Sequence, residues 1–166
     1  MPSPHTLAET EERVASLLGA LPIDFESMAV ASNLFRAANA TRNYFERSVL
    51  AEAGLSWTAF VVLWVVWIWE PIETRQIAEE GGFSKATLTG VLGTLEAKGY
   101  LLRERSERDG RLVEVRMTDA GRSFMTTIFP RFNEHERTVA STIAPERRGE
   151  LADMLRAITV VTERSS

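Results

Sequence analysis

One segment of the chain, residues 84–121, has a pattern that few folds can accommodate. It opens with Ser84, a good helix N-cap, followed by apolar residues that recur every three or four positions. Two strand-like stretches, 101–107 and 112–117, then flank the turn pair Asp109-Gly110. The segment therefore predicts a helix that is followed directly by a β-hairpin.

Helix patterns lie on both sides of this segment. A helix at 74–80 ends at Gly81-Gly82 just before Ser84, which is the spacing of a helix-turn-helix. Periodicity and capping residues predict further helices at 7–20, 24–53, 57–69, 119–141 and from Pro145 onward. The expected fold class is mainly α with a small β-hairpin wing: a winged helix-turn-helix domain flanked by N- and C-terminal helices that form a dimerisation region.

The expected boundaries divide one compact chain, not independent domains. Residues 1–22 form an N-terminal extension with a short helix, 55–118 form the winged helix-turn-helix, and 23–54 with 119–163 form the helical dimerisation region. The apolar stripes of the terminal helices are too long for a small domain to cover alone. A symmetric homodimer covers them, and it places two recognition helices about one DNA turn apart.

Composition excludes several classes of site. The chain has no cysteine and two histidines, so disulfides, thiol chemistry and a transition-metal site are not expected. His135 stands between Glu134 and Glu136, but adjacent helix positions point apart, so they do not form a metal site. We expect no cofactor and no catalytic group, because the chain has neither a nucleophile–base pair nor a phosphate-binding loop.

The most apolar run, residues 59–69, is shorter than the roughly 20 residues that span a membrane, which favours a buried helix. The first residues are acidic and lack the apolar core of a signal peptide. We therefore expect a cytoplasmic protein with no membrane partner.

The distribution of charge points to a polyanionic partner. The formal net charge is −4, yet residues 84–122 hold eight basic and six acidic residues, a balance of +2. A helix with a small, polar outer face beside an arginine-tipped hairpin suits double-stranded DNA, since one element can enter a groove while the other reaches the next. The arginines could instead be the solvated face of a hairpin, balanced by its glutamates.

Several short motifs occur together in this region. They are Ile77-Ala78, Ser84-x-x-Thr87, Leu95-Glu96-x-x-Gly99-Tyr100-Leu101, Asp109-x-Arg111 and Met117-Thr118-x-x-Gly121. In this combination the chain resembles the MarR family of winged-helix transcription regulators. The resemblance covers about residues 24–163 in element order, and its specific motifs lie within 72–121.

Members of that family are homodimeric DNA-binding repressors or activators, and many release DNA when they bind small aromatic acids. The resemblance implies that the helix after Ser84 approaches bases and phosphates in the major groove, and that Arg111 enters the minor groove, oriented by Asp109. The candidate DNA-binding residues are Ser84, Lys85, Thr87, Thr89, Gly90, Thr94, Arg103, Arg105, Arg108, Asp109 and Arg111. Gly90 and Thr94 depart from the family habit, which favours a long polar residue there, so the wing arginines would carry more of the affinity.

The resemblance also implies an effector pocket between the first long helix, the tryptophan-rich helix and the wing domain. The candidate residues are Phe35, Asn39, Tyr44, Trp57, Phe60 and Trp64. The alternative interpretation, which aromatic residues at helical spacing favour, is a packed core.

Two functions remain open at this stage. The first is a homodimeric regulator on a pseudo-palindromic operator, released or modulated by a small aromatic or lipophilic effector. The second is a winged-helix interaction or dimerisation module that does not bind DNA, which the acidic total charge and the arginine-poor helix favour.

Overall fold

A computed structural model describes residues 5–106 and 109–164 of the 166-residue chain. It divides into two units, residues 1–43 and 44–166, and each is considered by itself. As the sequence predicts, the chain is mainly helical with one small antiparallel sheet.

The first unit holds α1 (Leu7–Leu18) and most of α2 (Phe25–Arg47), and both helices begin where the sequence predicts. Thr6 and Glu9 form a capping box on α1, in which each side chain accepts the other's backbone N–H, at 3.2 and 2.7 Å. The Asp24 carboxylate caps α2 by accepting the backbone N–H groups of Glu26 and Ser27 at 3.0 and 3.1 Å.

The single helix predicted over 24–53 is wrong, because the helix breaks at Ser48. The Ser48 hydroxyl donates to the carbonyl of Tyr44 at 2.7 Å, and its backbone leaves the helical region with φ −107° and ψ −110°. A serine hydroxyl that competes for helix carbonyls in this way weakens the ladder. The chain resumes as α3 (Val49–Glu52), whose Val49 and Leu50 are fully buried, and Gly54 then turns with a positive φ.

Three helices form the helix-turn-helix and the layer beneath it. They are α4 (Trp57–Trp69), α5 (Thr74–Gly81) and α6 (Lys85–Ala97), and each lies within a residue of its predicted bounds. Ser56 and Ser84 cap α4 and α6 through their hydroxyls. Gly82, in the turn, has a φ of +64°, a conformation that glycine adopts without strain.

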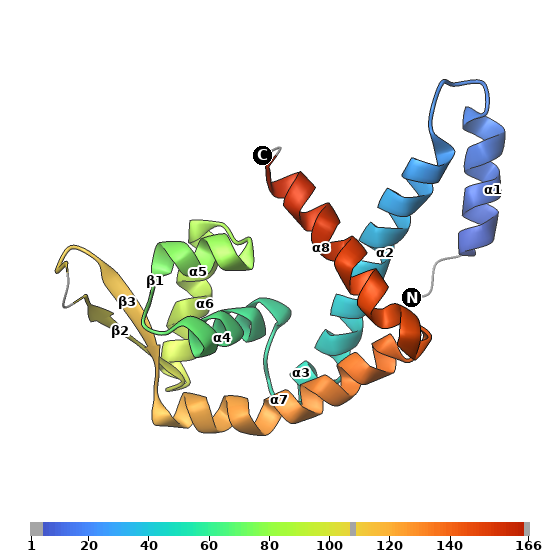
Figure 1. The fold of residues 1–166 in the computed structure, drawn as a ribbon. Coiled ribbons are helices and arrows are strands. Elements are labelled where there is room, and N and C mark those ends of the chain that lie inside the picture. The colour runs from blue at the N-terminus through green and yellow to red at the C-terminus, as the bar shows by residue number, and fades with distance from the viewer. Residues whose placement is uncertain (1–4, 107–108, 165–166) are drawn as a thin grey trace. The chain divides into compact units, whose positions relative to one another are not determined.

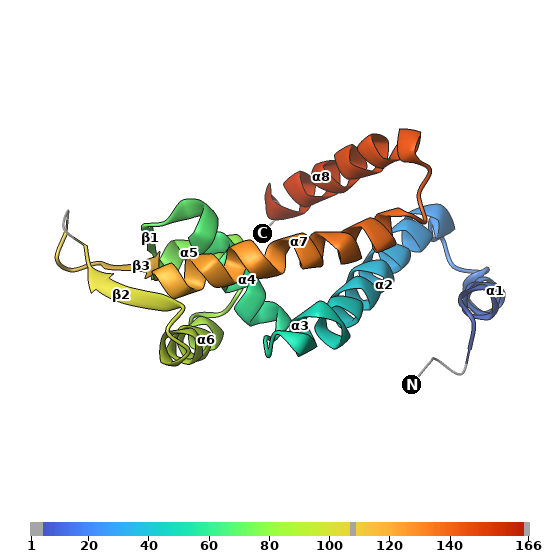
Figure 2. The ribbon, with the colours of Figure 1, turned by 90° about the horizontal axis from the view of Figure 1, so that it is seen from below.

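The sheet has three strands in the order β1-β3-β2: β1 (Ile72–Glu73), β2 (Leu101–Arg105) and β3 (Val113–Met117). The β2–β3 hairpin confirms the predicted wing, with Leu101 opposite Met117. The two views in Figures 1 and 2 show this hairpin extending away from α4, α5 and α6. The short β1, which pairs Ile72 with Val115, was not predicted, since two residues are too few to show alternation.

The hairpin turn differs from the predicted two-residue turn at Asp109-Gly110. β2 ends at Arg105, the Ser106 N–H bonds the Leu112 carbonyl at 3.0 Å, and Gly110 does not have the positive φ that the tight turn requires. Instead the Leu112 N–H bonds the Asp109 carbonyl at 2.9 Å, which makes a β-turn inside a longer loop. The predicted residues 107 and 108 lie outside the described residues.

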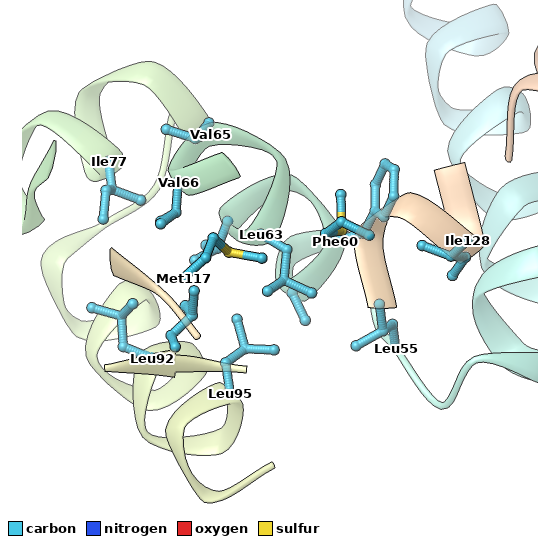
Figure 3. Packing of buried hydrophobic residues seen from close by; sticks show 14 of the residues in the cluster. Leu55, Phe60, Leu63, Val65, Val66, Ile77, Leu92, Leu95, Met117 and Ile128 are labelled. Atoms are coloured by element: carbon cyan, nitrogen blue, oxygen red, sulfur yellow. The ribbon is translucent and has the colours of Figure 1, made fainter. Parts of the chain in front are cut away.

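The core of the second unit forms around α4. Val62, Leu63 and Val66 of this helix have no exposed surface. Figure 3 shows Leu63 lying near Met117 of β3 and Leu95 of α6, and Leu92 of α6 belongs to the same cluster. Burial of each such side chain contributes roughly 1.5–3 kcal/mol, so this contact fixes α6 and the wing on one base.

The C-terminal part consists of α7 (Asp119–Ala140), a 3-10 turn η1 (Pro145–Arg147) and α8 (Arg148–Arg164). Thr118 caps α7, and the helix continues through Pro130 without a break. No residue of α8 is buried, although its sequence carries an apolar stripe.

Within the described residues, no single helix has the length and apolar character needed to cross a membrane. The bent pair Phe25–Glu52 and Trp57–Trp69 meets that test of length and composition only when its two parts are joined.

We predict that Gly121→Ala destabilises the protein by about 2 kcal/mol or more, as expected for overpacking in a rigid site. A Cβ at this position would lie 2.1 Å from the Tyr100 carbonyl oxygen, where α7 passes the start of β2. Chemical denaturation at fixed protein concentration measures the effect. The matched control is Gly93→Ala on α6, where a Cβ meets nothing within 4 Å, and where alanine is expected to raise stability. Equal behaviour of the two variants would contradict this account.

Candidate nucleic-acid interface

The outer face of α6 is the first half of the candidate site. Leu88, Leu92 and Leu95 are buried beneath the helix and leave the opposite side in solvent. All six residues that the sequence assigns to this face are exposed: Ser84, Lys85, Thr87, Thr89, Gly90 and Thr94.

The hydroxyl protons on this face are used within the helix. Thr89 Oγ1 donates to the Lys85 carbonyl at 2.8 Å, and Thr94 Oγ1 donates to the Gly90 carbonyl at 3.0 Å. What these threonines present outward is therefore an oxygen lone pair and a methyl group. Such groups suit an amino group on a base edge or the methyl group of thymine.

Glycines 90 and 93 have no internal reason to be small. A Cβ added at either position would meet nothing within 4 Å. Each glycine lowers the stability of the helix by about 1 kcal/mol relative to alanine. Because neither has a side chain, the backbone is uncovered in the middle of the α6 face. The face therefore allows a neighbouring molecule to approach the α6 backbone closely.

The wing is the second half of the site, and its arginines are not equivalent. Arg103 and Glu96 of α6 form a two-pronged ion pair, with Arg103 Nε donating to Glu96 Oε1 at 2.9 Å. The hydrogen bonds to Glu96 raise the pKa of Arg103 above its usual value. Arg105, two residues further along the same strand, is exposed. Arg103 thus ties the wing to α6, a role that strand alternation did not indicate.

At the wing tip, Asp109 acts on the backbone. Its Oδ1 accepts the N–H of Arg111 at 3.0 Å, and its carbonyl accepts the N–H of Leu112 at 2.9 Å. Both bonds shape the turn that presents Arg111, whose side chain is exposed. Arg108 lies outside the described residues, so its predicted position cannot be compared.

A hollow of about 660 Å³ lies between α5, α6 and the wing. Lys85, Thr89 and Arg103, all predicted from the sequence, are among the residues that line it, and Thr74 and Arg75 of α5 line it as well. Arg75 was not predicted as a site residue. It forms an ion pair with Glu79 at 2.7 Å. Its position at the start of α5, the first helix of the helix-turn-helix, was the sequence signal that could have indicated it. The hollow lies between the two halves of the site, and its lining is mixed, with these polar side chains beside apolar ones such as Phe83 and Val113.

The predicted effector residues fall into three groups. Tyr44, Trp57 and Phe60 lie in one aromatic cluster with Phe45 and Phe132, in which the Phe60 and Phe132 rings stack at 4.2 Å. The Tyr44 hydroxyl bonds to His135 Nδ1 at 2.7 Å.

Trp64 belongs to a second cluster, where it stacks on Phe129 at 4.7 Å and meets Trp67 edge-on. Phe35 and Asn39 belong to the first unit, in which Phe35 is exposed and the Asn39 side chain bonds the Phe35 carbonyl. The structure therefore brings three of the six candidates together.

The chain is similar to known transcription regulators. Residues 55–113 match the model described as the MarR family. The HTH-type transcriptional regulator YwaE of Bacillus subtilis, itself uncharacterised, is 35% identical over 155 residues, which cover 92% of this chain and 91% of YwaE.

Solved structures share the fold. BpsR of Bordetella bronchiseptica, described for the regulation of its DNA binding by 6-hydroxynicotinic acid, has a TM-score of 0.71 at 22% identity, covering 78% of this chain and 92% of that one. MepR of S. aureus, solved in complex with DNA, has a TM-score of 0.69 at 19% identity, covering 78% and 96%.

We predict that Arg103 contributes to DNA affinity according to the state of Glu96. In a Glu96→Gln background, Arg103→Ala should make the negative slope of log affinity against log salt less steep by about 0.9, the value for one phosphate contact. In the wild-type background the fall should be smaller, because Glu96 already neutralises the guanidinium. Arg105→Ala is the matched control and should give the same fall in both backgrounds, measured by fluorescence anisotropy on duplex DNA. Equal effects of Arg103→Ala in the two backgrounds would refute the pairing.

Proposed function

The chain belongs to the MarR family of DNA-binding transcription regulators, and we propose that it acts as a homodimer on a pseudo-palindromic operator. In this proposal α6 of each subunit enters the major groove and the β2–β3 wing reaches the adjacent minor groove. Like its relatives, the protein is a transcription regulator and not an enzyme. Of the two functions open from sequence, the comparisons favour the one that binds DNA.

One observation carries the proposal: the exposed face of α6, which bears small side chains, lies beside an exposed hairpin that carries arginines. Leu92 and Leu95 hold α6 on the core from below, so that its polar side faces outward. The wing, which follows α6 directly in the chain, leaves Arg105 and Arg111 exposed to solvent. This arrangement separates base-reading groups on the helix from phosphate-binding and minor-groove groups on the wing.

Exposed apolar side chains support the homodimer. α8 leaves Met154, Leu155, Val160 and Val161 between 39% and 65% exposed, and it buries no residue within its own chain. In the first unit, Leu17, Val30 and Phe35 are also exposed, at 57–72%. Surfaces of this kind mark interaction sites, and a second subunit would cover them symmetrically.

An aromatic effector is the second part of the proposal. The cluster around Tyr44, Trp57 and Phe60 combines ring faces with one polar pair, Tyr44 and His135, which is the chemistry of a site for a small aromatic acid. The regulation of BpsR by 6-hydroxynicotinic acid is a precedent in a protein of the same fold. Release of DNA requires a coupling free energy of about 1–3 kcal/mol between the two sites.

Selection of bound duplexes from random DNA tests the operator proposal. We expect the recovered sequences to be inverted repeats whose half-sites lie about one helical turn apart, bound by a dimer in sedimentation analysis. Recovery of single half-sites bound by a monomer would contradict it.

We predict that Arg111→Ala weakens binding to the selected duplex by at least about 1 kcal/mol, roughly fivefold, because it removes the minor-groove contact. Thermal unfolding and sedimentation should be unchanged, since the side chain is exposed. A well-folded variant with wild-type affinity would refute the minor-groove role.

We also predict that at least one hydroxylated aromatic acid, tested with 6-hydroxynicotinic acid as the first compound, lowers affinity for the selected duplex by fivefold or more. Tyr44→Phe should abolish this response while leaving effector-free affinity intact, because it removes only the hydroxyl that bonds His135. The chain's second tyrosine, Tyr100, stacks on Phe124, and Tyr100→Phe is therefore the control that should respond normally. If no acid acts, or if the two variants respond alike, the proposed effector site is wrong.

A further inference from the structure

Glu70 makes an unusual set of contacts just after the end of α4. Its Oε2 accepts the backbone N–H of Met117 at 2.7 Å, and its Oε1 forms an ion pair with Arg122. Arg122 in turn donates to the Met117 carbonyl at 3.2 Å. The backbone of Met117 is thus held at both its N–H and its carbonyl by one acid–base pair.

The sheet explains why a side chain is needed at this point. In the register of β1 with β3, Ile72 lies opposite Val115, so residue 70 would be the next partner of Met117. β1 is only two residues long and begins at Ile72, so it supplies no backbone acceptor there. The Glu70 carboxylate takes that place, with its side chain only 15% exposed.

Met117 is the position at which the wing joins the rest of the chain. It is the last residue of β3, and Thr118 alone separates it from α7. Figure 1 shows β3 leading directly into α7. The Glu70–Arg122 pair therefore connects three elements: the end of α4, the end of the wing strand and the first turn of α7.

The wing has other attachments to the same base. Arg103 of β2 pairs with Glu96 of α6, and just after β3 the Thr118 hydroxyl donates to the Gly99 carbonyl at 2.6 Å. β3 also pairs with β1 and buries Val115 and Met117 in the core. The Glu70–Arg122 pair adds the charged attachment of β3 to the end of α4 and to α7.

We propose that Glu70, with Arg122 as its partner, is a positioning residue that sets the angle of the wing relative to α7 and so places Arg111 for contact with DNA. The DNA part of this inference rests on the proposed minor-groove role of the wing. The positioning part concerns the protein alone and is tested without DNA.

The first experiment measures hydrogen exchange in free Glu70→Gln and Arg122→Gln dimers. Each substitution removes one charge of the pair. The Met117 N–H keeps an acceptor in both variants, the amide oxygen in Glu70→Gln and the unchanged carboxylate in Arg122→Gln, so the fold is expected to persist. Exchange should accelerate at least tenfold across β3 and β2 while α6 and the α4 core stay as protected as in the wild type. The control is Glu52→Gln, which breaks an exposed ion pair with Arg131 and should leave wing exchange unchanged. Wild-type exchange in the wing of both variants would overturn the inference.

The second experiment combines Glu70→Gln with Arg111→Ala on the selected duplex. If the wing is no longer held in position, Arg111 contributes little to DNA affinity. The loss of affinity caused by Arg111→Ala should therefore shrink from about fivefold to almost none. In the Glu52→Gln background the penalty should stay whole.

The two arms fail differently. Faster wing exchange with an undiminished Arg111→Ala penalty would show that Glu70 supports stability alone and would overturn its positioning role. An Arg111→Ala variant that binds like the wild type would refute the minor-groove contact of the proposed function, and the exchange data would still decide whether Glu70 holds the wing.

Discussion

Burial of α4 is the constraint on which the second unit depends. This helix contacts α5, α6, α7 and β3, and its Val62, Leu63 and Val66 have no access to solvent. Because one helix underlies every element of the candidate interface, the α6 face and the wing are placed by the same set of van der Waals contacts. A change in the packing of Leu63 or Val66 would move both halves of the interface together.

Local chemistry made much of this fold predictable. Serine caps, glycine ends and helical apolar spacing placed α4, α5 and α6 within about a residue, and Gly99, just after α6, has the left-handed conformation that glycine favours at a helix end. Prediction failed where a long-range contact overrides local preference. The break at Ser48 accompanies burial of Val49 and Leu50, and β1 exists only because Ile72 finds a partner more than forty residues away.

The interface shows the same division. Exposure of the α6 face followed from its periodicity, whereas the partners of individual charges did not. Arg103 and Arg105 were both predicted to bind DNA, yet the fold brings Glu96 against Arg103. Glu70 is the first residue after the helix predicted at 57–69, and its contacts with Met117 and Arg122 span about fifty residues. Ion pairs of this kind depend on which elements pack together, which no local pattern reports.

The vacant space above Gly90 and Gly93 has a consequence for evolution within this scaffold. Side chains introduced there displace no atom of the protein, so in the proposed complex with DNA new base preferences can arise at these positions without compensating changes in the core. Paralogues that diverge in the promoters they occupy could do so by single codon changes on this strip. Folding and sequence preference are to that extent free to evolve independently.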